Sequence, residues 1–559
     1  MSKPSGRLER TYRVMWDQNH PFQSHYNPPM PPETIAQAHC GFFPGTAVDA
    51  NVCALGPDAG YVTAFESRRT QMEYLVERYE KGAALGDVRY WRHAENLKQS
   101  WAQGIDPLEV QARESARLGI DHWFRLSMND WHHFDADSGS VYRLGGSRFY
   151  EERPDLLIGK EGAAGWSDSP DLPSHAERLS DVLPWMQDFA HDEVRALRRD
   201  IALEVCERYD CAGFLFDFLR VPAFFRFGEE RKNASLMTKM IRETREGLDE
   251  IARTKGRPLG LAVRVPPTVD GTVRMGLDVD TWIDDHLVDI VVTSPFFAQD
   301  FEHDAGEWVR LGADSPVKIM PAIEEGYLAG HSDGFNRWFY NPPVMTPLSV
   351  DMIRAVAARH HDRGADGLYV FNWFATALTF DYDNHSALDD IADPQRLRLM
   401  DKRYLLMRSH SSFPNCLDVD RQIPVEVTQT PVTLTFNVVD DVAAAPELVR
   451  SVRLLLHVDS LTVADELEVQ LNGVEARLAN PMEPGVMQGT VGGRYGTIWQ
   501  IFDLRDAPPR AGDNVVSVRA RQRNQRTASE IPLTIEDAEI EISYEYPSGT
   551  WAAPPGHAP

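Results

Sequence analysis

Short runs of apolar, strand-forming residues alternate with segments of helical periodicity from the start of the chain to residue 373. There are eight such runs, at residues 12–16, 46–55, 122–128, 213–218, 259–265, 288–294, 317–322 and 367–373. Strands that alternate with helices are typical of βα units around a parallel sheet. Eight parallel strands predict an α/β fold of the (β/α)8 type, the TIM barrel.

The segments between these runs carry apolar residues at helical spacing. Val194, Leu197, Ile201 and Val205 form one stripe in HDEVRALRRDIALEVCERYD, which predicts a helix that packs one face on a sheet. Further helical segments lie at residues 69–81, 107–118, 236–255, 278–287 and 350–363. The connecting segments therefore support the barrel.

The pattern changes near residue 416 to alternation of apolar and polar residues, with turn residues between the runs. The runs are VTLTFNVV, SVRLLLHV, DELEVQLNG, GTIWQIFDL, NVVSVRARQ and AEIEISYEY. A period of two without helical segments predicts an antiparallel β-sandwich. We therefore expect a barrel domain over residues 1–415, a sandwich over residues 425–546, and a flexible Pro/Gly/Ala-rich tail over residues 547–559.

Composition narrows the classes of partner. The 559 residues include 84 acidic and 57 basic side chains, for a formal charge of −27, which disfavours nucleic acid and anionic membranes. The opening sequence has no apolar run typical of a signal peptide, so a cytoplasmic location is expected. The five cysteines form no CxxC pair, which favours reduced, packed thiols.

Barrel enzymes carry their reacting groups at the carboxyl ends of the strands, and polar residues stand there in this sequence. They are Asp17, Asn129, Asp130, Asp217, Arg264, Glu324, Glu325 and Asn372. Asp217 is the most informative, because GFLFDFLR places it among large apolar residues where an unpaired charge is costly. A buried ion pair with Arg220 or Arg264 is the structural alternative, and such a pair is compatible with catalysis.

The strand-end carboxyl groups fit the hydrolysis of a glycosidic bond, which needs one group to protonate the leaving oxygen and one to attack or to activate water. We assign Asp217 as the nucleophile or base and Glu324 as the acid. Adjacent residues point to opposite faces if the strand continues through both, so Glu325 is expected to bind sugar or to support the acid from a neighbouring position. Replacing Asp217 by Asn is expected to abolish turnover with little loss of stability.

The segment SMNDWHHFD provides amides and rings suited to sugar hydroxyls and ring faces. Asn129, Asp130, His132 and His133 are therefore expected to bind substrate. Other expected substrate contacts are Asp17, Arg220, Arg264, Glu325, Tyr327, Asn372 and Trp373. A metal on the two histidines with Asp130 is an alternative, although the spacing differs from that of a helical zinc pair.

The stretches FRLSMNDWHH, YDCAGFLFDFLRVPAFF, LGLAVRVP and GLDVDTWIDDHLVDIVV resemble a group of bacterial glycoside hydrolase-like TIM-barrel proteins, often labelled family 10-like. The resemblance covers residues 11–407 and implies a sugar-processing role with a strand-four carboxylate, here Asp217. The C-terminal segment from LEVQLNGVEARL to DNVVSVRA resembles galactose-binding-like jelly rolls of carbohydrate enzymes, with Asn472–Gly473 as a hairpin turn.

These observations favour a glycoside hydrolase that acts without a cofactor on an oligosaccharide or small glycoside. Two alternatives stay open: a carbohydrate-binding barrel protein without turnover, and a metal-dependent barrel hydrolase. The fold itself does not choose among them. Formation of a homo-oligomer also stays open.

Overall fold

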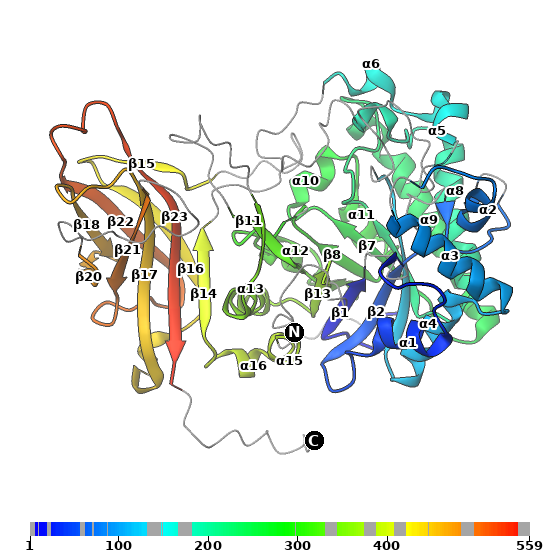
Figure 1. Cartoon of the computed structure of the whole chain (residues 1–559), viewed down its shortest axis with the longest axis horizontal. Helices are drawn as coiled ribbons and strands as arrows, with labels where there is room; N and C mark the ends of the chain where they lie inside the picture. Colours follow the sequence, from blue (N-terminus) through cyan, green and yellow to red (C-terminus); the bar gives the residue numbers. More distant parts are fainter. Residues whose placement is uncertain are drawn as a thin grey trace. The chain divides into compact units, whose positions relative to one another are not determined.

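The computed structural model contains two compact units, which are described separately (Figure 1). The first unit comprises residues 1–348, 360–392 and 409–419, and the second comprises residues 349–359, 393–408 and 420–559. The structure describes residues 6–8, 10–18, 24–55, 62–69, 72–85, 88–130, 147, 149–165, 182–296, 298–329, 344–373, 387–406, 421–444, 446–481 and 497–545. The tail predicted at residues 547–559 lies outside this part of the chain.

A parallel sheet of nine strands organises the first unit. Its order is β10-β13-β1-β2-β5-β6-β7-β8-β9. The strands are β1 (Val14–Gln18), β2 (Val48–Ala54), β5 (Asp121–Ser127), β6 (Gly213–Asp217), β7 (Gly260–Val265), β8 (Ile290–Thr293), β9 (Lys318–Ile319), β10 (Ala322–Glu324) and β13 (Leu368–Phe371). Every predicted run therefore overlaps a strand of this sheet. The seventh run overlaps two, because Pro321 has no N–H for the ladder and lies between β9 and β10.

Helices connect most successive strands of this sheet; α8, for example, precedes β6 in the chain and α9 follows it. Within the described part of the first unit, the helices longer than five residues are α1 (Pro32–Cys40), α2 (Leu75–Glu80), α3 (Val88–Ala102), α4 (Pro107–Arg117), α8 (Asp192–Arg208), α9 (Glu230–Lys255), α10 (Val269–Arg274), α11 (Val279–Asp284) and α12 (Gly306–Leu311). A further helix, α13 (Val350–Asp362), spans the boundary between the two sets of residues. Local chemistry sets the ends: Asp106 caps α4 by accepting from Leu108 N at 3.0 Å, and Gly256 ends α9 at φ +69°.

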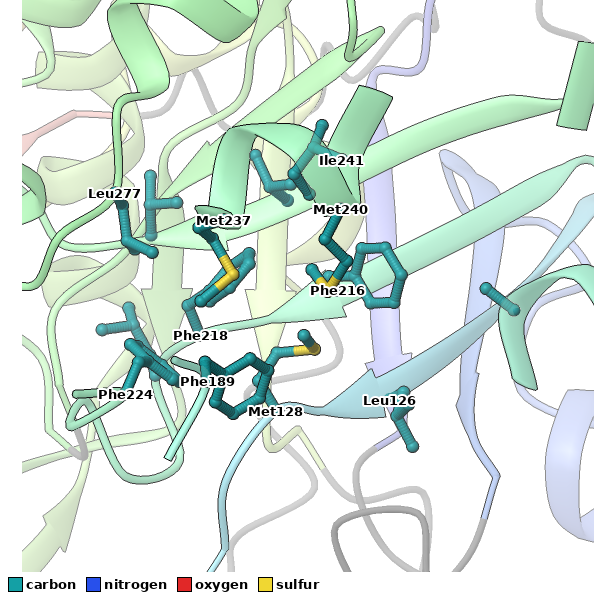
Figure 2. Close-up of a cluster of buried hydrophobic side chains, with 14 of the residues drawn as sticks. Leu126, Met128, Phe189, Phe216, Phe218, Phe224, Met237, Met240, Ile241 and Leu277 are labelled. Carbon is teal, nitrogen blue, oxygen red and sulfur yellow. The ribbon is translucent and has the colours of Figure 1, made fainter. Parts of the chain in front are cut away.

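The outer face of the sheet packs against these helices through a large apolar cluster. Phe216 of β6, Phe218 just after it and Leu126 of β5 belong to this cluster together with Met237 and Met240 of α9 (Figure 2). All five side chains are at most 3% exposed. Because side chains alternate along a strand, the residues between these phenylalanines face the other side of the sheet.

The inner face of the sheet forms a second, smaller apolar cluster to which strands distant in the sheet order contribute. It contains Met15, Ala50, Val52, Trp123, Leu215, Ala262, Ile290, Val292, Ala322, Tyr369 and Phe371, with Tyr12 and Met320. The Arg264 guanidinium of β7 lies 3.6 Å from the ring centre of Phe371 of β13, although these strands are not neighbours in the sheet. The sheet is therefore curled, so that its inner face packs on itself.

Two antiparallel sheets organise the second unit. One has the order β14-β23-β17-β21-β20, with β15 pairing β23, and the other has the order β16-β22-β18-β19. The strands are β14 (Lys402–Leu406), β15 (Val425–Val427), β16 (Val432–Val438), β17 (Val449–Asp459), β18 (Glu466–Leu471), β19 (Val474–Glu475), β20 (Arg477–Leu478), β21 (Thr497–Asp503), β22 (Gly512–Gln522) and β23 (Leu533–Tyr544). Their alternating apolar residues share one core, to which Phe436 of β16 and Leu454 of β17 both belong.

Two local features of the second unit bear on the sequence predictions. Asn472 and Gly473 have φ angles of +52° and +83° and join β18 to β19, as expected of an Asn-Gly hairpin. Residues 402–406, which the sequence analysis assigned to the N-terminal domain, form β14 and pair with β23 in the structure.

Lys402 of β14 belongs to a buried polar cluster of the second unit. Its ammonium lies 2.8 Å from Asp440 Oδ1, which also accepts from the Tyr544 hydroxyl at 2.5 Å, while Tyr404 donates to Oδ2 at 2.5 Å. This cluster ties β14 and β23 to the loop after β16.

Among the helices that the structure describes, none combines the length and the apolar character needed to cross a membrane.

Candidate active site

A layer of charged side chains lies at the carboxyl end of the parallel sheet. Asp17, Arg125, Asp217, Arg264 and Glu324 come from β1, β5, β6, β7 and β10, and each is at most 1% exposed. All five occupy inward positions, two residues after members of the inner apolar cluster. The curl of the sheet therefore brings together charges that are up to 307 residues apart in sequence.

Asp217 is held at both carboxylate oxygens. Oδ1 accepts from Arg264 Nη1 at 3.1 Å and from the backbone N–H of Leu219 at 2.9 Å, and Oδ2 accepts from Arg125 Nη1 at 2.5 Å. The structural alternative weighed from the sequence, an ion pair with Arg264, is therefore present. Arg220 was the other arginine considered as a partner of Asp217. Its Nε lies 3.9 Å from Asp130 Oδ2.

Glu324 is held at one oxygen only. Its Oε1 accepts from Arg264 Nη2 at 2.7 Å and from the Ser294 hydroxyl at 3.2 Å. Its Oε2 is buried and has no hydrogen-bond partner among the described residues. One guanidinium, that of Arg264, thus bridges Asp217 and Glu324.

Asp17 joins the same layer from β1. Its Oδ2 lies 3.1 Å from Arg125 Nε and accepts a hydrogen bond from the Tyr369 hydroxyl of β13. Its Oδ1 is buried without a partner in the described part of the chain. Burial raises the pKa of Asp17, against the lowering influence of Arg125 and Tyr369.

The two carboxyl groups that Arg264 bridges differ in pKa direction. Burial acts to raise the pKa of Asp217, but Arg264 and Arg125 outweigh it, so the pKa lies below its ordinary value. Burial raises the pKa of Glu324 to about 7 in spite of Arg264 and Ser294. At neutral pH the pair bridged by Arg264 therefore contains one firmly ionised carboxylate and one carboxyl group that can carry a proton.

Glu325 follows β10 in a bend and does not continue the strand. The expectation that Glu324 and Glu325 point to opposite faces therefore loses its premise, because it required an unbroken strand. Burial, and then repulsion from Glu324, raise the pKa of Glu325 to about 9. The two glutamates are close enough to influence each other's ionisation.

Other residues predicted from the sequence lie around this layer or outside it. Asn129 is 1% exposed, and its amide bonds the backbone of Gln187 and Ala223, so it fixes loops and is not open to a sugar. Tyr327 contacts Phe301 with ring centres 5.6 Å apart. His132 and His133 lie outside the described residues.

Two predicted residues follow the last strand of the sheet. Asn372 has φ +61°, a left-handed conformation that is uncommon for a residue other than glycine. Trp373 is 3% exposed, and its ring packs at 81° to that of Trp16, with the centres 6.3 Å apart. The Trp373 indole N–H is buried without a partner among the described residues.

Sequence reasoning missed Arg125, Ser294 and Tyr369. Arg125 could have been found, because it interrupts the apolar run HWFRLSM two residues after inward-facing Trp123. Ser294 and Tyr369 give no such signal, since a serine at a strand end and a tyrosine inside a strand are common in any sheet.

No group of three or more His, Cys, Asp or Glu side chains within the described ranges could hold a metal ion. The alternative of a metal on His132 and His133 with Asp130 is not decided by this, because both histidines fall outside those ranges. The described layer itself combines carboxyl groups with arginines, whose cationic side chains do not bind metal cations.

No family model matches the chain. No curated protein matches it in sequence. Among solved structures, the PgaB (BpsB) glycoside hydrolase domain from Bordetella bronchiseptica is similar over 68% of this chain and 99% of that chain, with 12% identity and a TM-score of 0.37. The chitinase ChiW from Paenibacillus sp. str. FPU-7 is similar over 85% of this chain and 49% of that chain, with 10% identity and a TM-score of 0.35. A glycoside hydrolase family 18 N-acetylglucosaminidase from Paenibacillus barengoltzii is similar over 68% of this chain and 100% of that chain, with 10% identity and a TM-score of 0.36. These likenesses are too distant to assign a family or an activity.

Proposed function

We propose that the protein is a glycoside hydrolase that cleaves an O-glycosidic bond with two carboxyl groups. The observation that carries the proposal is the opposite pKa shift of Asp217 and Glu324 on either side of the Arg264 guanidinium. A pair of carboxyl groups whose environments push their pKa values apart supplies an acid and a base at one pH. Glycoside hydrolysis needs this combination.

In this mechanism Glu324 protonates the leaving-group oxygen. Its pKa of about 7 leaves it protonated in slightly acidic solution and able to give the proton up near neutrality. Asp217 remains ionised and attacks the anomeric carbon or activates water. Glu325, Asp17, Arg220, Asn372 and Trp373 bind the sugar, which we propose to be an oligosaccharide or small glycoside.

A second candidate is a carbohydrate-binding protein without turnover. The complete burial of Asp217 and the occupation of both its oxygens by arginine favour this candidate, because a nucleophile must reach its substrate. In that case the charged layer fixes the shape of the site, and no bond is cleaved.

The proposal extends to the architecture. We propose that the curled sheet closes into an eight-stranded (β/α)8 barrel, because only Met320 and Pro321 separate β9 from β10, the two ends of the sheet order. Met320 N–H donates to Val291 O at 2.9 Å, and Tyr369 N–H donates to Pro321 O at 3.1 Å, so this segment is bonded on both sides. The second unit is proposed as a jelly-roll-like sandwich. The domain limits at 415 and 425 and the cytoplasmic location stay predictions.

Glu324→Gln tests the reaction through its dependence on the leaving group. The variant is expected to slow hydrolysis of a natural glycoside by about 10²–10⁴-fold, the usual worth of a positioned proton donor. It should largely spare an aryl glycoside whose phenolate departs without a proton. The measurement is kcat/KM over a series of aryl glycosides of increasing phenol pKa.

Glu325→Gln is the matched control for this series, because it replaces the adjacent carboxyl group by the same amide. It should change KM for all substrates alike. If Glu325→Gln shows the leaving-group dependence instead, the two roles are exchanged. A wild-type protein that binds sugars but hydrolyses no member of the series supports the binding protein.

A further inference from the structure

The two oxygens of Glu324 have different surroundings. Oε1 receives two hydrogen bonds, from Arg264 and Ser294, whereas Oε2 is buried and receives none among the described residues. The backbone N–H of Glu324 is fixed as well, because it donates to Gln299 Oε1 at 3.0 Å. The carboxyl group is thus held in one orientation.

Ser294 is itself oriented by Arg264. Arg264 Nε and Nη2 both donate to the Ser294 hydroxyl oxygen, at 3.1 and 2.9 Å. The single hydrogen of the hydroxyl must then point away from the guanidinium. Two acceptors lie within its reach, Glu324 Oε1 at 3.2 Å and Pro295 O at 3.0 Å, and the hydrogen can bond one of them at a time.

We propose that Ser294 is a positioning residue that keeps Oε1 of Glu324 as the hydrogen-bond acceptor, so that the transferable proton resides on Oε2. A carboxyl oxygen that already accepts from a guanidinium and a hydroxyl has no room for a proton of its own. An ionised oxygen buried without a donor is costly, so Oε2 is the place for the proton. The catalytic meaning of this arrangement rests on the proposed function; the location of the proton does not.

Four groups face the Glu324 carboxyl. Arg264, Arg220 and the Ser294 hydroxyl favour its ionised form. The fourth group is Glu325, whose own pKa is raised by repulsion from Glu324. Removal of the Ser294 hydroxyl is therefore expected to raise the pKa of Glu324 further. It also removes a hydrogen bond from the C=O of the protonated acid, whose stretching frequency should rise.

Ser127 provides a matched control in the same layer. Its hydroxyl accepts from Arg125 Nη1 at 3.1 Å, as that of Ser294 accepts from Arg264, but it has no bond to Glu324. Ser127→Ala thus removes a serine that contacts an arginine of the layer and leaves the surroundings of the acid intact.

The experiment is infrared titration of the full-length protein without substrate. The band of protonated Glu324 is identified as the one that disappears in Glu324→Gln. In Ser294→Ala this band should move to higher frequency, and its titration midpoint should move to higher pH, whereas Ser127→Ala should change neither. An unchanged band in Ser294→Ala, or an equal shift in Ser127→Ala, overturns the proposal. Ser294→Cys, with a weaker donor of similar size, gives the same reading if Ser294→Ala does not fold.

A kinetic arm separates this inference from the proposed function. On substrates with poor leaving groups, Ser294→Ala should lower kcat roughly tenfold, as expected for one lost hydrogen bond to an ionisable group, with KM little changed. Ser294→Thr, which keeps the hydroxyl, should restore kcat. If the infrared shift is found but Glu324→Gln hydrolyses glycosides normally, the proton is placed correctly and the proposed function fails. If Glu324→Gln loses activity on substrates with poor leaving groups but Ser294→Ala does not shift the infrared band of Glu324, the proposed function stands and Ser294 has no positioning role.

Discussion

Each unit of the molecule contains a buried network of charges, and the two networks differ in how completely they are satisfied. In the second unit both oxygens of Asp440 are bonded, to Lys402, Tyr404 and Tyr544. In the first unit Glu324 Oε2 and Asp17 Oδ1 are buried without a partner among the described residues. The residues of both networks are buried, with none more than 6% exposed, so burial alone does not separate them.

The difference indicates different purposes. A buried polar network in which every group is bonded fixes the fold, whereas a buried polar group left without a partner needs an explanation, and chemistry is one. The Asp440 cluster is closed and joins β14 and β23 to a loop. The layer around Asp217 leaves two carboxyl oxygens without a partner among the described residues, and it lies at the carboxyl end of the sheet, the end at which barrel enzymes carry their active sites.

The largest effect is expected from Asp217→Asn, which should both abolish turnover and lower the free energy of unfolding by about 3–5 kcal/mol. The variant leaves Arg125 and Arg264 without their shared buried carboxylate. The small stability loss expected from sequence alone is therefore revised. Chemical denaturation and kcat on aryl glycosides check the two parts, and a variant as stable as wild type would show that the arginines find other partners.

Asp440→Asn sharpens the comparison from the other side. The free energy of unfolding should also fall by about 3–5 kcal/mol, because the Lys402 ammonium remains buried without its counter-charge. Turnover should stay close to wild type, since Asp440 has no role in the proposed reaction. Urea denaturation measures the first effect and kcat the second. Loss of activity in the folded variant would contradict the distinction between a closed and an open network.

A smaller effect is expected in the pH dependence of stability. The unfolded chain releases the Glu324 proton near the ordinary value of 4.5, while the folded protein keeps it up to about pH 7. The contribution of Glu324 to the free energy of unfolding is therefore fully present below pH 4.5. It is lost as the pH rises to about 7, by on the order of 3 kcal/mol. Glu324→Gln should remove this fall, as measured by urea denaturation from pH 4.5 to 8.

The same measurement on Glu325→Gln is the comparison for this prediction. Glu325, with a pKa raised to about 9, should continue the loss of stability above pH 7. Parallel stability curves for wild type and Glu324→Gln would show that Glu324 is ionised in the folded protein at neutral pH, which would remove it as the acid.

The strands were predictable and several helices were not. Strand runs such as GFLFD and GLAVRV are apolar, branched and bounded by turns, so their local pattern is unambiguous. Residues 88–102, by contrast, form α3 although VRYWRHAENLKQSWA mixes charged and aromatic residues. Burial of His93, Ala94 and Leu97, all at most 2% exposed, stabilises this helix, which the sequence pattern does not predict.

The candidate site was predictable in part for the same reason. Asp217 stands at the end of an apolar run, so a buried carboxylate at the end of this strand could be expected. The run GFLFDFLR is apolar on both faces, so alternation by itself does not decide that Asp217 points inward. The partners of Asp217 do not follow, because Arg125 and Arg264 reach it from other strands. The curl of the sheet decides which side chains of different strands lie in contact, and no local sequence pattern encodes these contacts.

The sequence by itself determined the strands, their parallel arrangement through the intervening helices, and the carboxylates at their ends. It did so because hydrophobic periodicity and turn chemistry act over a few residues. Only the tertiary structure decided that two arginines bond Asp217 while Glu324 keeps one oxygen without a partner among the described residues. These properties depend on burial and on charges brought together from five strands, so they arise only when the sheet curls and excludes water.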